Sequence, residues 1–256
     1  MHRHDSATAD GHAGRRRFRL ATVDLDDTVW PCMPVIRAAE EALYAWLSEY
    51  TPRLAEAHDL VSLREHRRVL KETRPELAHD VTALRHAALS ALLSEHGYPD
   101  TLAEVAMDVF RRARNQVQPY ADAAPALARL RQEMCVVAVT NGNAEVRHTP
   151  LRDAFDRVLT AAEAGAMRPD PALFHMAMDW AGAAPAETLH IGDDPIRDVD
   201  AARRAGLASV WVNRDGLTWP DGLPPPVHEV RDLRGLLRWL DGGGATAAAR
   251  GGADAL

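Results

Sequence analysis

The segment Asp24–Thr28, with the sequence DLDDT, places three carboxylates within four positions directly after the apolar run 18–23. At an effective dielectric constant near 20, two such charges about 4 Å apart repel each other by about 4 kcal/mol. A cation or a proton must offset this repulsion. An acidic turn or a helix cap would show the same residues, so the segment alone does not define a function.

A second acidic group follows another apolar run, Leu189–Ile191. It contains Asp193, Asp194 and Asp198 within the sequence GDDPIRD. Carboxylates that come from two separate strand ends suit a hard cation with a preference for oxygen ligands, such as Mg²⁺. The two acidic groups together therefore indicate a divalent metal site.

Two further polar motifs follow predicted strands or precede a predicted helix. Thr140, Asn141 and Gly142 supply a hydroxyl, an amide and an unhindered backbone, which can form a cradle for phosphate or an oxyanion. An Asn-Gly pair after a strand is more often only a turn. Arg168 before Pro169 is, taken alone, typical of a surface charge before a helix start.

The elements that must position these motifs alternate between strand and helix after Pro119. We expect strands at 18–24, 135–140, up to 160, 188–192 and 209–212, and helices at 124–132, 171–181, 196–205 and 233–240. This alternation predicts right-handed crossover units and a doubly wound, Rossmann-like parallel sheet in the α/β class. The carboxyl ends of parallel strands meet at one edge, where such sheets bind ligands.

The segment between the first and second predicted strands has a different pattern. Apolar residues recur at helical spacing in about four stretches of 33–117, which predicts an inserted all-helical cap domain. The core domain is then formed by 18–32 and 118–240. We expect a disordered leader over 1–17 and a flexible tail over 241–256.

The composition excludes several classes of protein. The net charge of −7 argues against a general nucleic-acid binder. No apolar run approaches the roughly 18 residues of a membrane helix, and no apolar stretch follows the basic residues 15–17 as in a signal peptide. Two cysteines without an evident partner, Cys32 and Cys135, fit a reducing compartment, so we expect a cytoplasmic protein.

Taken in this order, the four motifs resemble those of the haloacid dehalogenase-like (HAD) hydrolase superfamily. The similarity extends over about 18–240, and the insertion resembles the helical cap of subclass I. Segments Asp24–Thr28, Pro34–Ile36, His79–Thr82 and Thr140–Asn143, with Pro75, resemble a narrower group. These are bacterial phosphatases that act on FMN and on 5-amino-6-(5-phosphoribitylamino)uracil.

The resemblance implies roles for the acidic residues. Asp24 corresponds to a nucleophile that forms an aspartyl phosphate. Asp26 corresponds to a general acid and then base, and its backbone carbonyl to a metal ligand. Asp193 corresponds to a Mg²⁺ ligand that acts together with Asp24. Asp194 and Asp198 are expected to orient metal-bound water and the basic residue of the site.

The same resemblance places the phosphate-binding groups. Thr140, Asn141, Gly142 and Thr28 are expected to bind the phosphoryl oxygens. Arg168 stands where the family usually has lysine; it keeps the charge on a longer, forked head. The chain has one lysine, Lys71, among 30 basic residues, which fits this replacement.

The residue Trp30 follows the first motif and is expected to line the entrance of the site. There its ring could stack on an isoalloxazine or pyrimidine, although packing between cap and core is an alternative.

The resemblance implies a Mg²⁺-dependent phosphatase for a small phosphorylated metabolite, with FMN or the ribitylaminouracil phosphate as candidates. Alternatives are a sugar phosphate, phosphoglycolate, a nucleoside monophosphate, or a non-catalytic sensor of phosphorylated ligands. A dehalogenase is disfavoured, because that reaction needs neither a metal nor a proton donor, yet Asp26 and Asp193 are both present. We expect neither a nucleic-acid nor a membrane partner, and either a monomer or a homodimer.

Overall fold

The computed structural model describes residues 18–244. The expected disordered leader, 1–17, and residues 245–256 of the expected flexible tail, 241–256, lie outside the described residues. The first residue of that expected tail, Asp241, is the last residue of helix α10 (Leu233–Asp241). Among the described helices, none has the length and apolar character needed to cross a membrane.

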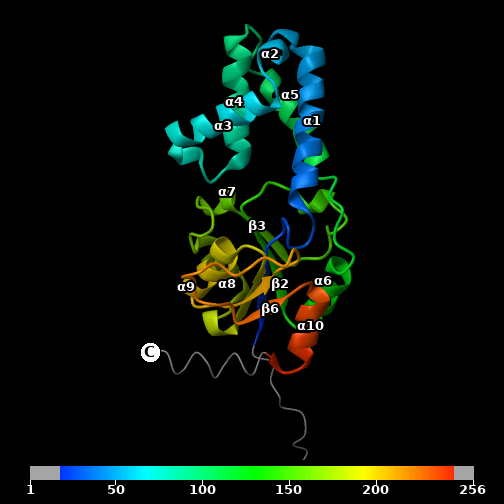
Figure 1. Cartoon of the computed structure of the whole chain (residues 1–256), viewed down its shortest axis with the longest axis vertical. Helices are drawn as coiled ribbons and strands as arrows, with labels where there is room; N and C mark the ends of the chain where they lie inside the picture. The colour runs from blue at the N-terminus through cyan, green and yellow to red at the C-terminus, as the bar shows by residue number, and fades with distance from the viewer. Residues whose placement is uncertain (1–17, 245–256) are drawn as a thin grey trace, which may run out of the picture.

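A six-stranded sheet, parallel throughout, forms the centre of the lower lobe in Figure 1. The order across the sheet is β3-β2-β1-β4-β5-β6. The strands are β1 (Leu20–Val23), β2 (Cys135–Thr140), β3 (Arg157–Thr160), β4 (Thr188–Gly192), β5 (Ala208–Val212) and β6 (His228–Val230). From β1 the chain builds outward in both directions, which confirms the predicted doubly wound fold.

Helices cover both faces of the sheet because its strands present apolar side chains on both sides. On one face, Val23 and Ala138 pack in a cluster with Leu127 of α6 (Ala123–Arg131) and Leu236 of α10 (Leu233–Asp241). On the other face, the neighbouring strand residues Leu20 and Val137 face α8, α9 and the short α7. These helices span Ala172–Ala181, Ala201–Arg204 and Ala161–Ala164. Alternate residues of each strand thus serve opposite layers.

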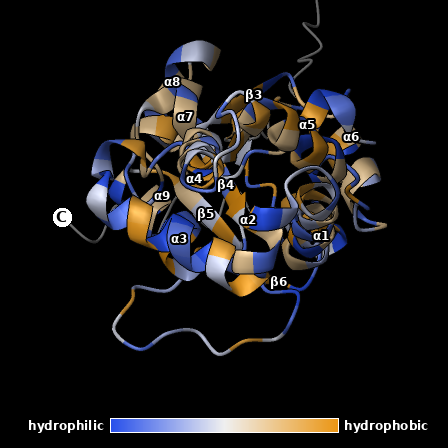
Figure 2. Ribbon diagram, turned by 90° about the horizontal axis from the view of Figure 1, so that it is seen from above, coloured by the Kyte–Doolittle hydropathy of each residue, from blue (hydrophilic) through white to orange (hydrophobic). Residues whose placement is uncertain are grey.

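Five helices between β1 and α6 form the upper lobe (Figure 1). They are α1 (Cys32–Tyr50), α2 (Pro52–Ala57), α3 (Leu60–Thr73), α4 (Val81–Glu95) and α5 (Leu102–Arg114). A core of their own holds them together, with Leu43, Leu92, Met107 and Phe110 at its centre. Viewed from this end of the molecule, α3 is mostly hydrophilic (Figure 2).

Three features differ from the sequence-based expectations. The strand β6, only three residues long, was not predicted. The predicted helix over 196–205 is divided into a π-helical segment, η4 (Pro195–Asp200), and α9. Cys135 begins the predicted strand 135–140 as expected, but its side chain is exposed, because it lies at the amino end of β2.

Candidate active site

Three adjacent strands, β2, β1 and β4, bring the polar motifs to one edge of the sheet. Asp24 follows the last residue of β1, Thr140 ends β2, and Asp193 follows β4. The strands are parallel, so these three positions lie at the same carboxyl edge. The edge faces the helical lobe in Figure 1.

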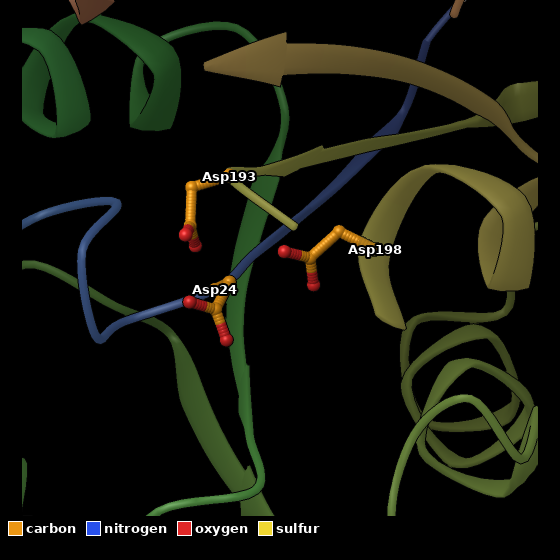
Figure 3. A group of neighbouring side chains, drawn as sticks. All are labelled: Asp24, Asp193 and Asp198. Carbon is orange, nitrogen blue, oxygen red and sulfur yellow. The ribbon is translucent and has the colours of Figure 1, made fainter. Parts of the chain in front are cut away.

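The carboxylates of Asp24, Asp193 and Asp198 converge there (Figure 3). Each offers an oxygen that lies within 4.8 Å of those of the other two. Burial, against the opposing charge of Arg168, raises the pKa of Asp24 well above its ordinary value. Burial and the charge of Asp198 raise the pKa of Asp193 to about 7. A divalent cation would relieve this repulsion, so the donor set fits Mg²⁺.

The guanidinium of Arg168 bridges two of these carboxylates. Its Nη2 donates to Asp24 and its Nη1 to Asp198, and the side chain is 3% exposed. Burial alone would raise the pKa of Asp198, but Arg168 and His190 lower it to about 2. Arg168 therefore neutralises Asp198 and partly neutralises Asp24, and the expected contact between Asp198 and the basic residue is present.

The backbone of Arg168 is fixed by the side chain of Asn141. The Arg168 amide donates to Asn141 Oδ1 at 2.8 Å, and Asn141 Nδ2 donates to the Arg168 carbonyl at 2.9 Å. The polar side-chain atoms of Asn141 thus position the basic residue, and binding of phosphate by the amides near Asn141 stays a prediction.

A buried histidine, His190, contacts the acidic cluster through Asp198. His190 Nε2 lies 3.2 Å from Asp198 Oδ1, and its Nδ1 lies 2.9 Å from the hydroxyl of Thr22. Burial lowers the pKa of His190, which favours a neutral ring. A neutral ring satisfies both contacts when Nε2–H donates to Asp198 and Nδ1 accepts from Thr22. Sequence reasoning missed this residue, which lies inside the apolar pattern of β4.

The carboxylate of Asp26 is oriented by two residues that are not part of the acidic cluster. Nη2 of Arg114 donates to both of its oxygens at 2.7 Å, and Trp30 Nε1 donates to Oδ1 at 2.8 Å. Arg114 ends α5 and is 1% exposed. Sequence reasoning also missed Arg114, because three arginines in the last turn of a helix look like solvated charge.

The turn after β1 determines where the remaining residues point. Asp27 has a φ of 62°, and its Oδ1 accepts from the amide of Cys32, which closes the turn into α1. Thr28 is fully buried, and its hydroxyl donates to Asp193 Oδ1 at 3.1 Å. The expectation that Thr28 binds phosphate is corrected: in this structure its hydroxyl orients Asp193.

The expectation for Trp30 is corrected as well. Its exposed fraction is 0%, so the ring packs in the core and cannot stack on a ligand at the entrance. The alternative of packing between cap and core describes it better, with the added contact to Asp26.

Gly142 makes the close approach of the loop after β2 to Asp26 possible. A Cβ atom at this position would lie 2.6 Å from Asp26 Oδ2, which is closer than real Cβ contacts. The amide of Gly142 donates to the Thr140 hydroxyl at 2.9 Å. Glycine is therefore required here by space, and Thr140 is held by its own loop.

A cavity of about 250 Å³ joins these groups. Among its lining residues are the predicted site residues Asp24, Asp26, Thr140, Asn141, Gly142, Arg168, Asp193, Asp194 and Asp198. Asp194 also caps η4, since its Oδ1 accepts from the amides of Ile196 and Arg197. The structure thus brings nine of the predicted site residues together around one cavity. Thr28 and Trp30 are fully buried and do not line that cavity.

Comparison with known proteins agrees with this geometry. The family model for haloacid dehalogenase-like hydrolases matches residues 18–206. The chain is 30% identical over 225 residues to the 5-amino-6-(5-phospho-D-ribitylamino)uracil phosphatase YigB of Escherichia coli (strain K12). That alignment covers 84% of this chain and 93% of YigB. A phosphoserine phosphatase of Thermus thermophilus is 39% identical over 150 residues, with 56% of this chain and 59% of that protein covered.

A solved structure described as a 2-haloacid dehalogenase, from Pseudomonas syringae pv. Tomato DC3000, superimposes with a TM-score of 0.80 at 36% identity. The match covers 87% of this chain and 99% of the other.

Proposed function

We propose that this chain, a phosphatase of the haloacid dehalogenase-like hydrolase family, hydrolyses a small phosphate monoester. The proposed reaction is Mg²⁺-dependent and proceeds through an aspartyl-phosphate intermediate. The observation that carries the proposal is the convergence of Asp24, Asp193 and Asp198 beside a buried arginine. Asp26 lines the same cavity, and Arg114 orients its carboxylate.

The metal would be held by Asp24, Asp193 and the backbone carbonyl of Asp26. Asp198 is a poorer ligand, because Arg168, His190 and the amide of Asp194 already occupy its oxygens. When bound, Mg²⁺ supplies positive charge that screens the nucleophile from the phosphoryl group and stabilises the charge on the phosphoryl oxygens.

In the first step, a carboxylate oxygen of Asp24 attacks phosphorus. A bond forms between that oxygen and phosphorus, while the bond to the ester oxygen breaks. Asp26 donates a proton to the departing alkoxide, which leaves as an alcohol. Arg168, already in contact with Asp24, stabilises charge on the transferring group.

In the second step, water attacks phosphorus of the aspartyl phosphate. Asp26, now a carboxylate, accepts a proton from this water, and the bond between Asp24 and phosphorus breaks. Inorganic phosphate leaves and the Asp24 carboxylate is restored. The Thr140 hydroxyl, which lines the cavity, holds a phosphoryl oxygen in both steps.

The identity of the substrate is narrowed by the relatives. YigB covers most of this chain, so 5-amino-6-(5-phospho-D-ribitylamino)uracil is one candidate, with FMN beside it, and flavin metabolism would then be the setting. Phosphoserine is a second candidate from the Thermus relative. A reaction on such a soluble metabolite would place the protein in the cytoplasm.

A dehalogenase is the second candidate function, favoured by the similarity to the Pseudomonas structure. Displacement of a halide needs no proton donor on the leaving group and no metal. This chain nevertheless holds Asp26 with Arg114 and Trp30, and gathers acidic groups that suit a cation. These features favour the phosphatase.

The test is phosphate release from 4-nitrophenyl phosphate with Mg²⁺, in parallel with chloride release from 2-chloropropionate. We expect the wild-type protein to release phosphate but no chloride, and the variant Asp24→Asn to release neither. The control Asp153→Asn, at a side chain that is 90% exposed, should match wild type. Wild-type rates in Asp24→Asn, or chloride release alone, would refute the proposal.

A further inference from the structure

A second cavity, of about 400 Å³, lies between the helical lobe and the catalytic cavity. It shares the lining residues Asp26, Val81 and Gly142 with the catalytic cavity, so the two are adjacent. Its lining includes six basic side chains: Arg64, Arg67, Arg68, Lys71, Arg85 and Arg114.

The basic side chains of this cavity outnumber the acidic groups that could balance them. Arg68 is paired on its own helix with Glu65 and Glu72. Three others share one buried carboxylate, that of Glu40, which lies 2.6 Å from Arg64, 3.3 Å from Arg67 and 3.6 Å from Arg85.

The other two basic groups, Arg114 and Lys71, have different surroundings. Arg114 is paired with Asp26, and no described carboxylate lies within ion-pair distance of Lys71. Apart from Arg68, five cations therefore face two carboxylates, an excess of three positive charges.

Two of the arginines that line this cavity, Arg114 and Arg85, also carry buried donors that lack an acceptor among the described residues. Nε and Nη1 of Arg114, which is 1% exposed, have no hydrogen-bond partner, and neither has Nε of Arg85, which is 9% exposed. Buried donors of this kind cost free energy unless an acceptor is supplied. An anion in the cavity would offset the charge excess around these side chains.

The balance of charges around Arg85 gives independent support. Burial, and then the nearby charge of Arg67, lowers the pKa of Arg85 to about 9. Its guanidinium lies 3.8 Å from the centre of the Phe110 ring, so packing holds the side chain in place. Like charges are thus held close together and Glu40 offsets them only in part, so an added anion would stabilise the charged form of Arg85 further.

Exposure decreases along the cavity toward the catalytic residues. The side chain of Arg67 is 24% exposed, that of Arg85 10%, and that of Arg114 1%. Neutralisation of Glu40 alone would not explain why all three arginines line this cavity, because Arg114 contacts Asp26 and not Glu40.

We propose that this cavity binds a second anionic group of the substrate, a carboxylate or a second phosphate, while the ester phosphate lies at Asp24. The proposal rests on the proposed function and narrows its substrate class to phosphate monoesters that are themselves acids. It favours these over esters whose remainder is uncharged.

Two matched pairs of substrates test the preference with Mg²⁺ present. Glycerol 3-phosphate is compared with 3-phosphoglycerate, which adds a carboxylate, and fructose 1-phosphate with fructose 1,6-bisphosphate, which adds a phosphate. We expect kcat/KM to be about tenfold higher for at least one anionic member, the size expected for a hydrogen bond to a charged group. The pair that shows the preference identifies the group.

The variant Arg67→Gln should remove most of this preference while the rate with the uncharged member stays within about twofold. The uncharged member offers no second anion to Arg67, and Arg64 and Arg85 still neutralise Glu40. Arg74→Gln is the matched control: the same charge is lost from the same lobe, at a side chain that is 52% exposed and outside the cavity. Equal kcat/KM within both pairs, or a preference that survives in Arg67→Gln, would overturn the proposal.

Binding measurements separate this proposal from the proposed function. Titration calorimetry of Asp24→Asn, with and without Arg67→Gln, measures affinity for both members of each pair without turnover. Tighter binding of an anionic member that depends on Arg67 supports the second site even if no ester is hydrolysed. Equal affinities refute the second site, even if 4-nitrophenyl phosphate is hydrolysed.

Discussion

Arg114, the last residue of α5, donates from a single nitrogen to both carboxylate oxygens of Asp26, at 2.7 Å each. The residue that belongs to the helical lobe thus holds a residue that belongs to the sheet edge. Positioning of Asp26 therefore depends on where α5 ends relative to β1, and not only on the turn that contains it.

This contact predicts a kinetic effect that depends on the leaving group. In Arg114→Met, Asp26 loses its ion pair, so protonation of the leaving oxygen should suffer. We expect kcat for an alkyl ester such as glycerol 3-phosphate to fall about 10²-fold, within the range of general acid catalysis. Activity with 4-nitrophenyl phosphate, whose leaving group needs no proton, should fall much less. Equal losses with both esters would assign Arg114 a structural role only.

Arg168 links Asp24 to Asp198, so its removal should weaken charge stabilisation during phosphoryl transfer. We expect Arg168→Ala to lower kcat by about 10²–10³-fold, as for loss of one donor to a developing charge. Arg168→Lys keeps the charge but loses the bridging fork, and should keep measurable activity. Steady-state assays with 4-nitrophenyl phosphate measure both. An alanine variant with an undiminished rate would remove Arg168 from the site.

Removal of metal should abolish turnover, and a chelator with Mg²⁺ add-back tests this. A second readout is thermal unfolding, because an ion that binds only the folded state raises the midpoint. We expect Mg²⁺ to raise the midpoint of the wild-type protein, and a much smaller rise in Asp193→Asn. NaCl at equal ionic strength is the control. A wild-type midpoint that does not respond to Mg²⁺ contradicts the assigned ligands.

Asp122 predicts a pH dependence of stability away from the site. Its carboxylate accepts from Arg214 at 3.0 Å and from the amide of Leu233 at 2.6 Å. Burial raises its pKa, but Arg214 and the amide of Leu233 outweigh burial and hold the pKa of Asp122 below its ordinary value. The folded state therefore gains stability above the ordinary pKa of aspartate and loses it as the pH falls through the lowered value.

The expected result is a difference between pH 7 and strongly acidic solution. Asp122→Asn should lower the free energy of unfolding by about 1.5–3 kcal/mol near neutral pH, as for loss of a hydrogen bond to a charged group. Well below the lowered pKa the variant and the wild type should have similar stability. Urea titrations at the two pH values measure this. A constant difference at both would show that the charge of Asp122 is not the cause.

The position of the site was predictable from sequence because parallel strands end at one edge. Asp24, Thr140 and Asp193 each follow or end a strand with a clear apolar pattern, so their convergence follows from the order of the elements. The two corrected residues, Thr28 and Trp30, lie inside one tight turn, where side-chain direction depends on backbone angles such as the positive φ of Asp27.

Contacts between the lobes were not predictable. Arg114 and the basic cavity depend on how α3, α4 and α5 pack over the sheet edge, and their arginines occur in patterns that also describe a solvated helix face. The role of His190 was not predictable for a different reason, since a histidine in a buried strand has no distinctive spacing. Such groups become visible only when their partners are known.

The ion pair between the two lobes also limits how this enzyme can be recombined with its relatives. A chimera that took its helical insertion from another protein, with the junction placed before the last turn of α5, would keep Arg114 and with it the orientation of Asp26. A junction placed after that turn would exchange the guanidinium for whatever the donor protein carries there. Swapping insertions to change specificity should therefore succeed or fail according to the position of one splice point.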